Sequence, residues 1–347
     1  MLRRSALPAA ASLAIMLLAV TGCRIQIPNA AATSGNSASA PAGGPGVTRA
    51  GSLIVEPGAG FSPVYDVINR ARHTVDVIMY EFSDTIAEHD LAAAARRGVR
   101  VHVILDQREQ SVNSAAYSYL SSHDVKVTWS SPRYRYTHQK TVIVDGSEAV
   151  IMTANLTSQY YATSRDFLVL DTNRADAAAI TAVFDADFTH AGVRPGGGSD
   201  LVWSPTSSQD KLIGLIDGAT SSLRIYSEEM GDTAVENALI RAAKRGVDVQ
   251  VCGENQGGEY DRAYAKLARA GIRISYYSSP AGFYIHGKVI EADYGTAHAK
   301  VFIGSENFSN TSLNDNRELG LITSGHAVMS AIASTFAADF RNGQHWS

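Results

Sequence analysis

The sequence predicts an α/β protein made of two homologous halves, each with a central mixed sheet flanked by helices. Segments rich in Val and Ile alternate with amphipathic segments, a pattern typical of α/β domains. Stretches of chain recur at an offset of 148 residues, so that residues 74–106 match residues 222–254. A length of 347 residues with 45% hydrophobic residues suits about two domains of ordinary size.

The elements of both halves follow the same order. Helices are expected over 61–72, 86–97, 115–122, 175–188, 210–216, 233–245, 260–270 and 327–340. Strands are expected over 74–80, 99–105, 125–129, 141–144, 149–153, 167–170, 223–226, 247–252, 272–277 and 297–302. Asp84 and Asp232 are predicted N-caps, and Gly98 is the predicted end of the helix over 86–97.

The N-terminus is predicted to be a targeting segment. Residues 1–22 combine Arg3 and Arg4 with a short apolar run, and the sequence before Cys23 resembles a bacterial lipobox. We therefore expect a signal peptide over 1–22 and lipid on Cys23, which would anchor the chain to a bacterial membrane outside the cytoplasm. An ordinary secretory signal and an uncleaved anchor are the alternatives.

Composition divides the rest of the chain. Residues 23–50 are rich in Ala, Ser, Gly and Pro and predict a flexible tether. The two halves are expected over 51–193 and 201–347, with a Gly-rich joint over 194–200. The net charge of −4 does not favour a nucleic-acid partner, and Cys252 is expected to be a buried thiol on a strand.

One motif, H-x-K-x-x-x-x-D, occurs twice. Its residues are His138, Lys140 and Asp145 in the first copy, and His286, Lys288 and Asp293 in the second. Residues two apart on a strand share a face, so each histidine is expected to point the same way as its lysine. Each aspartate is expected to have mainly a structural, charge-pairing role. Two equivalent motifs in a duplicated chain predict one shared site at a pseudo-twofold axis between the halves.

Further polar residues align after each motif. The pairs are Thr153 with Ser305, Asn155 with Asn307, and Asp166 with Glu318. Hydroxyl and amide groups are suitable donors to phosphate oxygens. An acid–base histidine needs a partner on its other ring nitrogen, so the two carboxylates are expected to orient the histidines. Glu81 and Glu229 also align, and support of the site and support of the fold are both open for them.

With these residues, the chain resembles the phospholipase D superfamily in its single-chain form with two motifs, over about residues 52–340. The resemblance implies that both motifs, aspartates included, belong to one catalytic site that needs no metal or other cofactor. It implies that one histidine attacks phosphorus to give a phosphohistidine, while the other protonates the leaving alcohol and then activates water or an acceptor alcohol. It assigns His138 as nucleophile and His286 as general acid, with the reverse order open. Thr153 departs from the usual serine of the family but keeps the hydroxyl.

The flanking residues favour one substrate class over another. Tyr134, Arg135 and Tyr136 precede one motif, and Phe283 and Tyr284 precede the other. Such aromatic residues suit a membrane interface, would also stack on bases, and often fill strand edges. The lipid anchor and the acidic body favour phospholipase D-type hydrolysis or headgroup exchange of phospholipids at a membrane surface. An extracytoplasmic nuclease and an inactive lipid-binding relative are the alternatives. One chain supplies both half-sites, so a monomer is expected.

Overall fold

The computed structural model describes residues 52–196, 200–278 and 282–347. The predicted signal peptide, the whole predicted tether with Cys23, and residues 197–199 of the predicted joint lie outside these ranges. None of the helices within them combines the length and apolar character that crossing a bilayer requires.

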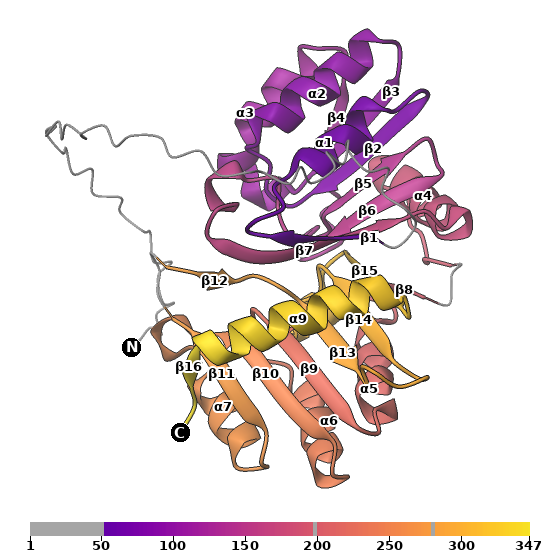
Figure 1. Cartoon of the computed structure of the whole chain (residues 1–347). Coiled ribbons are helices and arrows are strands. Elements are labelled where there is room, and N and C mark those ends of the chain that lie inside the picture. The colour runs from indigo at the N-terminus through magenta and orange to yellow at the C-terminus, as the bar shows by residue number, and fades with distance from the viewer. Residues whose placement is uncertain (1–51, 197–199, 279–281) are drawn as a thin grey trace, which may run out of the picture. The chain divides into compact units, whose positions relative to one another are not determined.

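The first half contains a mixed sheet with the strand order β1-β7-β6-β5-β2-β3-β4 (Figure 1). Its strands are β1 (Ser52–Glu56), β2 (Thr74–Met79), β3 (Arg100–Leu105), β4 (Lys126–Trp129), β5 (Thr141–Val144), β6 (Glu148–Met152) and β7 (Ser164–Asp171). Strands β2, β3 and β4 are parallel, whereas β5, β6 and β7 pair antiparallel.

The second half repeats this topology, with the order β16-β11-β10-β9-β13-β14-β15-β8. Its strands are β8 (Leu201–Ser204), β9 (Ser222–Ser227), β10 (Asp248–Glu254), β11 (Arg273–Tyr277), β13 (Val289–Ala292), β14 (Lys300–Gly304), β15 (Glu318–Thr323) and β16 (Gln344–His345). The short strand β12 (Tyr284–Ile285) leaves this half and pairs in parallel with β7 of the first sheet.

Helices flank both sheets, as the sequence predicts. They are α1 (Ser62–Asn69), α2 (Thr85–Arg96), α3 (Gln110–Ser121), α4 (Arg174–Phe188), α5 (Ser208–Gly218), α6 (Thr233–Lys244), α7 (Asp261–Ala268), α8 (Asn310–Asn314) and α9 (His326–Asn342). The predicted N-caps are confirmed, because Asp84 accepts from the amides of Ile86 and Ala87, and Asp232 from that of Val235. Short 3-10 turns lie at Gln107–Glu109, Ser158–Tyr160 and Gln256–Gly258.

Three apolar cores hold these layers together. One lies between the first sheet and α1–α3, and another between the second sheet and α5–α7. The third combines residues of both halves, including Phe184 of α4, Phe336 of α9 and Cys252 of β10. The two closing helices therefore lie between the sheets. This confirms the predicted fold of two homologous α/β halves, with the duplication expressed as one repeated topology.

Candidate active site

The carboxyl ends of corresponding segments in the two halves meet at one centre. His138 follows a segment that runs parallel to the segment before Glu318, with a bridge between Thr137 and Arg317. His286 follows β12, which pairs in the same way with the start of β7. Each histidine therefore reaches the centre beside a strand of the other half.

The two histidines are oriented by carboxylates across the interface between the halves. His138 Nδ1 lies 2.9 Å from Glu318 Oε2, and His286 Nδ1 lies 2.7 Å from Asp166 Oδ1. The sequence predicts these two carboxylates as partners of the histidines, and the structure adds that the pairs are crossed. An ionised carboxylate can only accept, so Nδ1 donates in both pairs and Nε2 is left for chemistry.

The electrostatics of the pairs fit this arrangement. Burial acts to raise the pKa of Glu318, but His138 and Lys140 outweigh it and hold that pKa below its ordinary value. Asp166 is held ionised in the same way by His286. Burial lowers the pKa of His138 despite the opposing effect of Glu318. The lowered pKa favours the neutral form of this ring. Side-chain exposures of 13% and 14% leave both rings accessible from one side.

Both lysines of the motifs are fully buried beside the histidines. Lys140 Nζ donates to the carbonyl of His138 over 2.6 Å, and Lys288 Nζ donates to that of His286 over the same distance. Burial lowers the pKa of Lys140 to about 7, so this ammonium holds its proton weakly in the free protein. An anion bound at the centre would stabilise the protonated, positively charged form of Lys140.

The motif aspartates lie elsewhere, and their grouping with the catalytic residues is corrected. Asp145 follows β5 and accepts from the amides of Arg72, His73 and Thr74, whereas Asp293 follows β13 and accepts from those of Thr220–Ser222. Both have a left-handed backbone, with φ of 52° and 56°, which Asp tolerates better than most residues. They fasten the far end of each strand, which is the structural role that the sequence also favours.

The predicted phosphate ligands fall into two groups. The hydroxyl of Thr153 donates to Asp166 over 2.6 Å, and that of Ser305 bonds to the backbone of Leu319 beside Glu318. These hydroxyls support the carboxylates instead of facing the centre, because each is buried against the neighbouring strand.

The asparagines are held by the aligned glutamates. Asn155 Nδ2 donates to Glu81 over 3.2 Å, and Asn307 Nδ2 to Glu229 over 3.0 Å. Each amide nitrogen has a second hydrogen available, so the asparagines fit the expected role better than the hydroxyls do. Glu81 and Glu229 thus support the site, which is one of the two roles that the sequence leaves open for them.

One residue of the centre, Glu228, is missed by sequence reasoning. Its Oε2 lies 2.6 Å from Lys288 Nζ and 3.6 Å from His286 Nε2, and Tyr284 donates to its Oε1 over 2.9 Å. Burial acts to raise its pKa, but His286 and Lys288 outweigh burial and hold it well below the ordinary value. A carboxylate therefore occupies the space in front of the second histidine and lysine.

The first half has Tyr80 at the position of Glu228. The Tyr80 ring centroid lies 4.5 Å from that of His138 and 5.0 Å from Lys140 Nζ, and its hydroxyl donates to Glu109. Tyr80 opposite Glu228 is an unlike pair inside a matched stretch, which is the signal that could have identified the residue. The centre is thus symmetric in His, Lys and Asn but asymmetric in charge.

Reciprocal ion pairs join the halves around the centre. Arg165 of β7 pairs with Asp339 of α9 at 2.7 Å, and Arg317 pairs with Asp187 of α4 at 2.8 Å. These contacts repeat the crossed pattern of the histidines. The contact between the halves is therefore isologous within one chain, as between the subunits of a symmetric dimer.

Comparisons with known proteins agree with this fold. The fold resembles phosphatidylserine synthase from Haemophilus influenzae, with a TM-score of 0.65, 11% identity, and coverage of 84% of this chain and 86% of that one. It also resembles polyphosphate kinase from Porphyromonas gingivalis, with a TM-score of 0.69 and 16% identity, over 84% of this chain but only 47% of the kinase. A search of curated protein sequences finds no match. The family model described as "Cardiolipin synthase, PLD-like domain" matches residues 64–188 and again 212–340, so the chain belongs to the phospholipase D-like family.

Proposed function

We propose that this protein is a phospholipase D-type enzyme that hydrolyses phospholipids, or exchanges their headgroups, through a phosphohistidine. The observation that carries the proposal is the convergence of two crossed histidine–carboxylate pairs and two buried lysines on one centre. Members of the phospholipase D superfamily act on phosphodiesters. Such a substrate is anionic, and the ammonium groups offset both its charge and the charge that develops on phosphorus oxygens.

In this mechanism Nε2 of neutral His138 attacks phosphorus, and the bond from phosphorus to the headgroup oxygen breaks. The leaving oxygen takes a proton from Nε2 of His286. Neutral His286 then removes a proton from water or an acceptor alcohol, whose oxygen attacks phosphorus and breaks the bond to His138. Lys140, Lys288, Asn155 and Asn307 are proposed to hold the phosphate oxygens throughout.

The surroundings of the two rings support this order of roles. His286 has a carboxylate beside each ring nitrogen, with Asp166 at Nδ1 and Glu228 3.6 Å from Nε2, and an imidazolium, the acid form of the ring, donates from both nitrogens. His138 faces a single carboxylate and the uncharged Tyr80. Glu228 is therefore proposed as the residue that separates the acid from the nucleophile.

The predicted N-terminus supports a phospholipid substrate. Lipid on Cys23 would hold the enzyme on an extracytoplasmic membrane surface, where phospholipids are abundant, and a monomer would suffice because one chain carries both half-sites. Hydrolysis of phosphatidylcholine vesicles and of single-stranded DNA by wild type and His138→Ala tests the proposal, with His326→Ala as the control for a histidine outside the centre. Phospholipid turnover lost only in His138→Ala is expected. DNA cleavage without lipid turnover would instead favour a nuclease. If neither substrate is turned over, a lipid-binding protein is favoured.

A further inference from the structure

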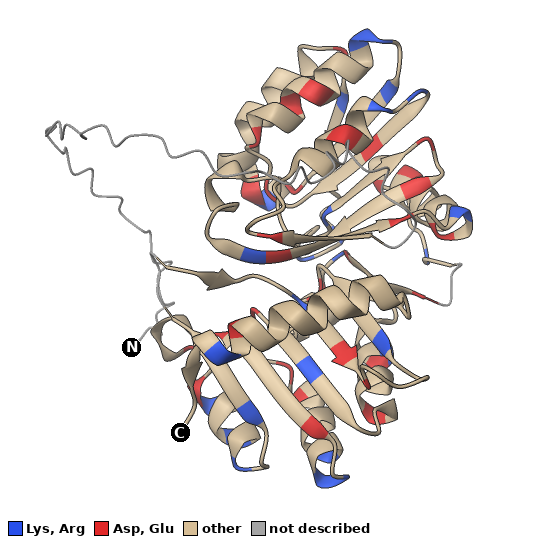
Figure 2. Ribbon diagram, in the orientation of Figure 1, with Lys and Arg blue, Asp and Glu red and all other residues tan. Residues whose placement is uncertain are grey.

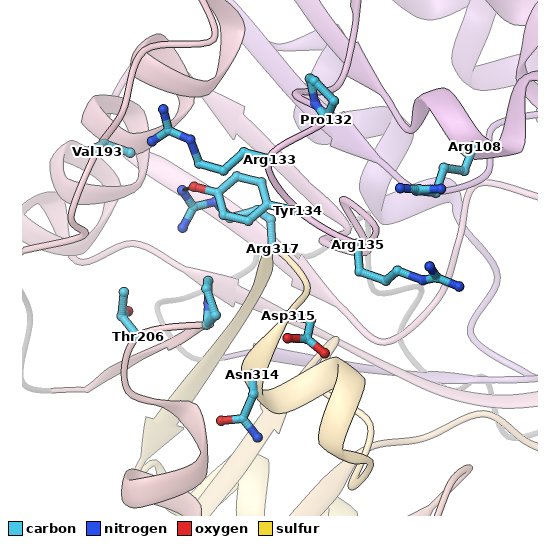
Figure 3. A pocket seen from close by; sticks show the side chains of 11 residues that line it. Arg108, Pro132, Arg133, Tyr134, Arg135, Val193, Thr206, Asn314, Asp315 and Arg317 are labelled. Carbon is cyan, nitrogen blue, oxygen red and sulfur yellow. Dashed lines mark hydrogen bonds between the residues drawn. The ribbon is translucent and has the colours of Figure 1, made fainter.

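A pocket of about 560 Å³ lies beside the segment that leads to His138 (Figure 3). Four arginines, from both halves, line it: Arg108, Arg133, Arg135 and Arg317. Arg133, Tyr134 and Arg317 gather on one side of the pocket, and Arg108 and Arg135 on the other (Figure 3). The second half also contributes Asp315, so the pocket exists only where the halves meet.

Three of these arginines form no salt bridge in the described parts of the chain. Arg317 is buried and paired with Asp187. The other three are Arg108, Arg133 and Arg135. Arg133 lies near enough to Asp187 to interact with it electrostatically, and Arg108 and Arg135 lie against the uncharged ring of Tyr136, 5.8 and 5.5 Å from its centroid. Elsewhere, basic and acidic residues are interspersed through both halves, and the chain carries a net charge of −4 (Figure 2). Arginines without a salt bridge around one pocket of an acidic protein indicate a site for an anion, and their forked donors match phosphate.

Two of the segments that line the pocket continue to the catalytic centre. The amide of Arg135 donates to the carbonyl of Asp315, and the amide of His138 donates to that of Arg317, each over 3.0 Å. Both segments therefore run from the pocket to the pair of His138 and Glu318. Three residues of extended chain span at most about 10 Å, which limits the backbone distance from Arg135 to His138.

The arginines of the first half that line the pocket are not repeated at the equivalent positions of the second half. At the offset of 148 residues, Arg108 corresponds to Gln256 and Arg135 corresponds to Phe283. Phe283 instead packs under Arg165, 5.0 Å from the guanidinium carbon to the ring centroid. Among the residues that the structure describes, this arginine lining therefore occurs on one side of the centre only. A site on one side could fix the orientation in which an asymmetric substrate binds.

We propose that this arginine pocket binds a second phosphate group of the substrate. The inference rests on the proposed function and names its substrate class: phospholipids whose headgroup alcohol is itself phosphorylated. A three-carbon alcohol separates two phosphates by only a few bond lengths, which is compatible with the limit of about 10 Å on the backbone distance between Arg135 and His138. The reacting phosphate then lies at the histidines while the second phosphate is held by the guanidinium groups of Arg108, Arg133 and Arg135.

The test compares two lipids that differ only in the second phosphate. Phosphatidylcholine vesicles contain either phosphatidylglycerol or phosphatidylglycerol phosphate, and release of glycerol or of glycerol 3-phosphate is measured. Wild type is expected to prefer the phosphorylated lipid by about tenfold or more in kcat/KM, the value of one charge-assisted contact. Arg108→Gln/Arg135→Gln should reduce this ratio to near one, and Arg133→Ala is a second, independent variant. Arg262→Gln, an exposed arginine outside the pocket, should keep the ratio.

A binding measurement separates failure of this inference from failure of the proposed function. Calorimetry with glycerol 3-phosphate needs no turnover and should show binding to wild type that is lost in Arg108→Gln/Arg135→Gln. Binding without any lipid turnover would refute the function but support the anion site. An equal loss of activity on both lipids would overturn the inference. So would a loss confined to cleavage of single-stranded DNA, which would assign the pocket to a nucleic acid.

Discussion

Replacement of Glu228 by Gln tests the charge asymmetry of the centre most directly. The carboxylate lies 2.6 Å from Lys288 Nζ. In the proposed mechanism this same ammonium group binds phosphate oxygens. An anion held by the same ammonium, over a usual contact of about 2.8 Å, would lie about 5 Å from the carboxylate. At an effective dielectric constant of about 20, two unit negative charges at that separation repel by about 3 kcal/mol.

That repulsion sets the expected size of the effect. A free energy of about 1.4 kcal/mol changes an equilibrium constant tenfold, so Glu228→Gln should bind sulfate about 100-fold more tightly than wild type. Turnover should fall in the same variant, because the carboxylate that lies 3.6 Å from Nε2 of His286 and pairs with Lys288 is lost. Tighter anion binding with slower turnover is the signature of a carboxylate that both competes with phosphate and supports the acid.

Calorimetric titration with sulfate measures the first effect without any need for turnover. Glu236→Gln is the matched control, because Glu236 pairs with Lys266 at 2.7 Å outside the centre. Its sulfate affinity should equal that of wild type. If Glu228→Gln binds sulfate as weakly as wild type or more weakly, the reasoning is refuted. Such a result would mean that Glu228 does not compete with bound anions for Lys288.

Three further predictions follow from the same geometry. Glu318→Gln should lower turnover about 10²- to 10⁴-fold at unchanged melting temperature, because His138 loses the partner that fixes its tautomer. Sulfate affinity of wild type should fall as the pH rises above about 7, where Lys140 loses its proton, whereas Lys140→Arg should show no such fall; a flat wild-type profile would count against the low pKa. Asp293→Asn should lower the free energy of unfolding in urea by about 1–3 kcal/mol at neutral pH while leaving turnover intact. Hydrogen bonds lower the pKa of Asp293 to about 2 against the effect of burial, so the difference from wild type should shrink as the pH falls from 4 towards 2.

Much of the fold is predictable because the duplication constrains it. The repeat places equivalent elements in both halves, and strand-rich and amphipathic segments alternate with clear periods. Strand β15 was missed because Gly320 interrupts it, and glycine weakens the pattern of a strand. In the structure this glycine leaves room for the ring of Phe302, which a side chain would meet. The short edge strands β1 and β8 were missed because they border segments rich in small residues.

The members of the candidate site were largely predictable, but their partners were not. Repetition identified both histidines and both carboxylates, since each recurs at an aligned position. Which carboxylate orients which histidine depends on how the two halves face each other, and no local pattern encodes that. The hydroxyls of Thr153 and Ser305 illustrate the same limit, because a residue type compatible with phosphate is equally compatible with supporting a neighbouring carboxylate.

The covalent linkage of the halves explains how the centre can be unequal at all. In a symmetric dimer, a glutamate at the position of Glu228 would stand before both histidines, because both subunits share one sequence. A duplicated chain can keep Tyr80 in one half and Glu228 in the other, and likewise Arg135 in one half and Phe283 in the other. The ion pairs of Arg165 with Asp339 and of Arg317 with Asp187 keep the contact between the halves symmetric, while these other positions differ. Each half can then specialise, one towards the nucleophile and a charged part of the substrate, the other towards the acid.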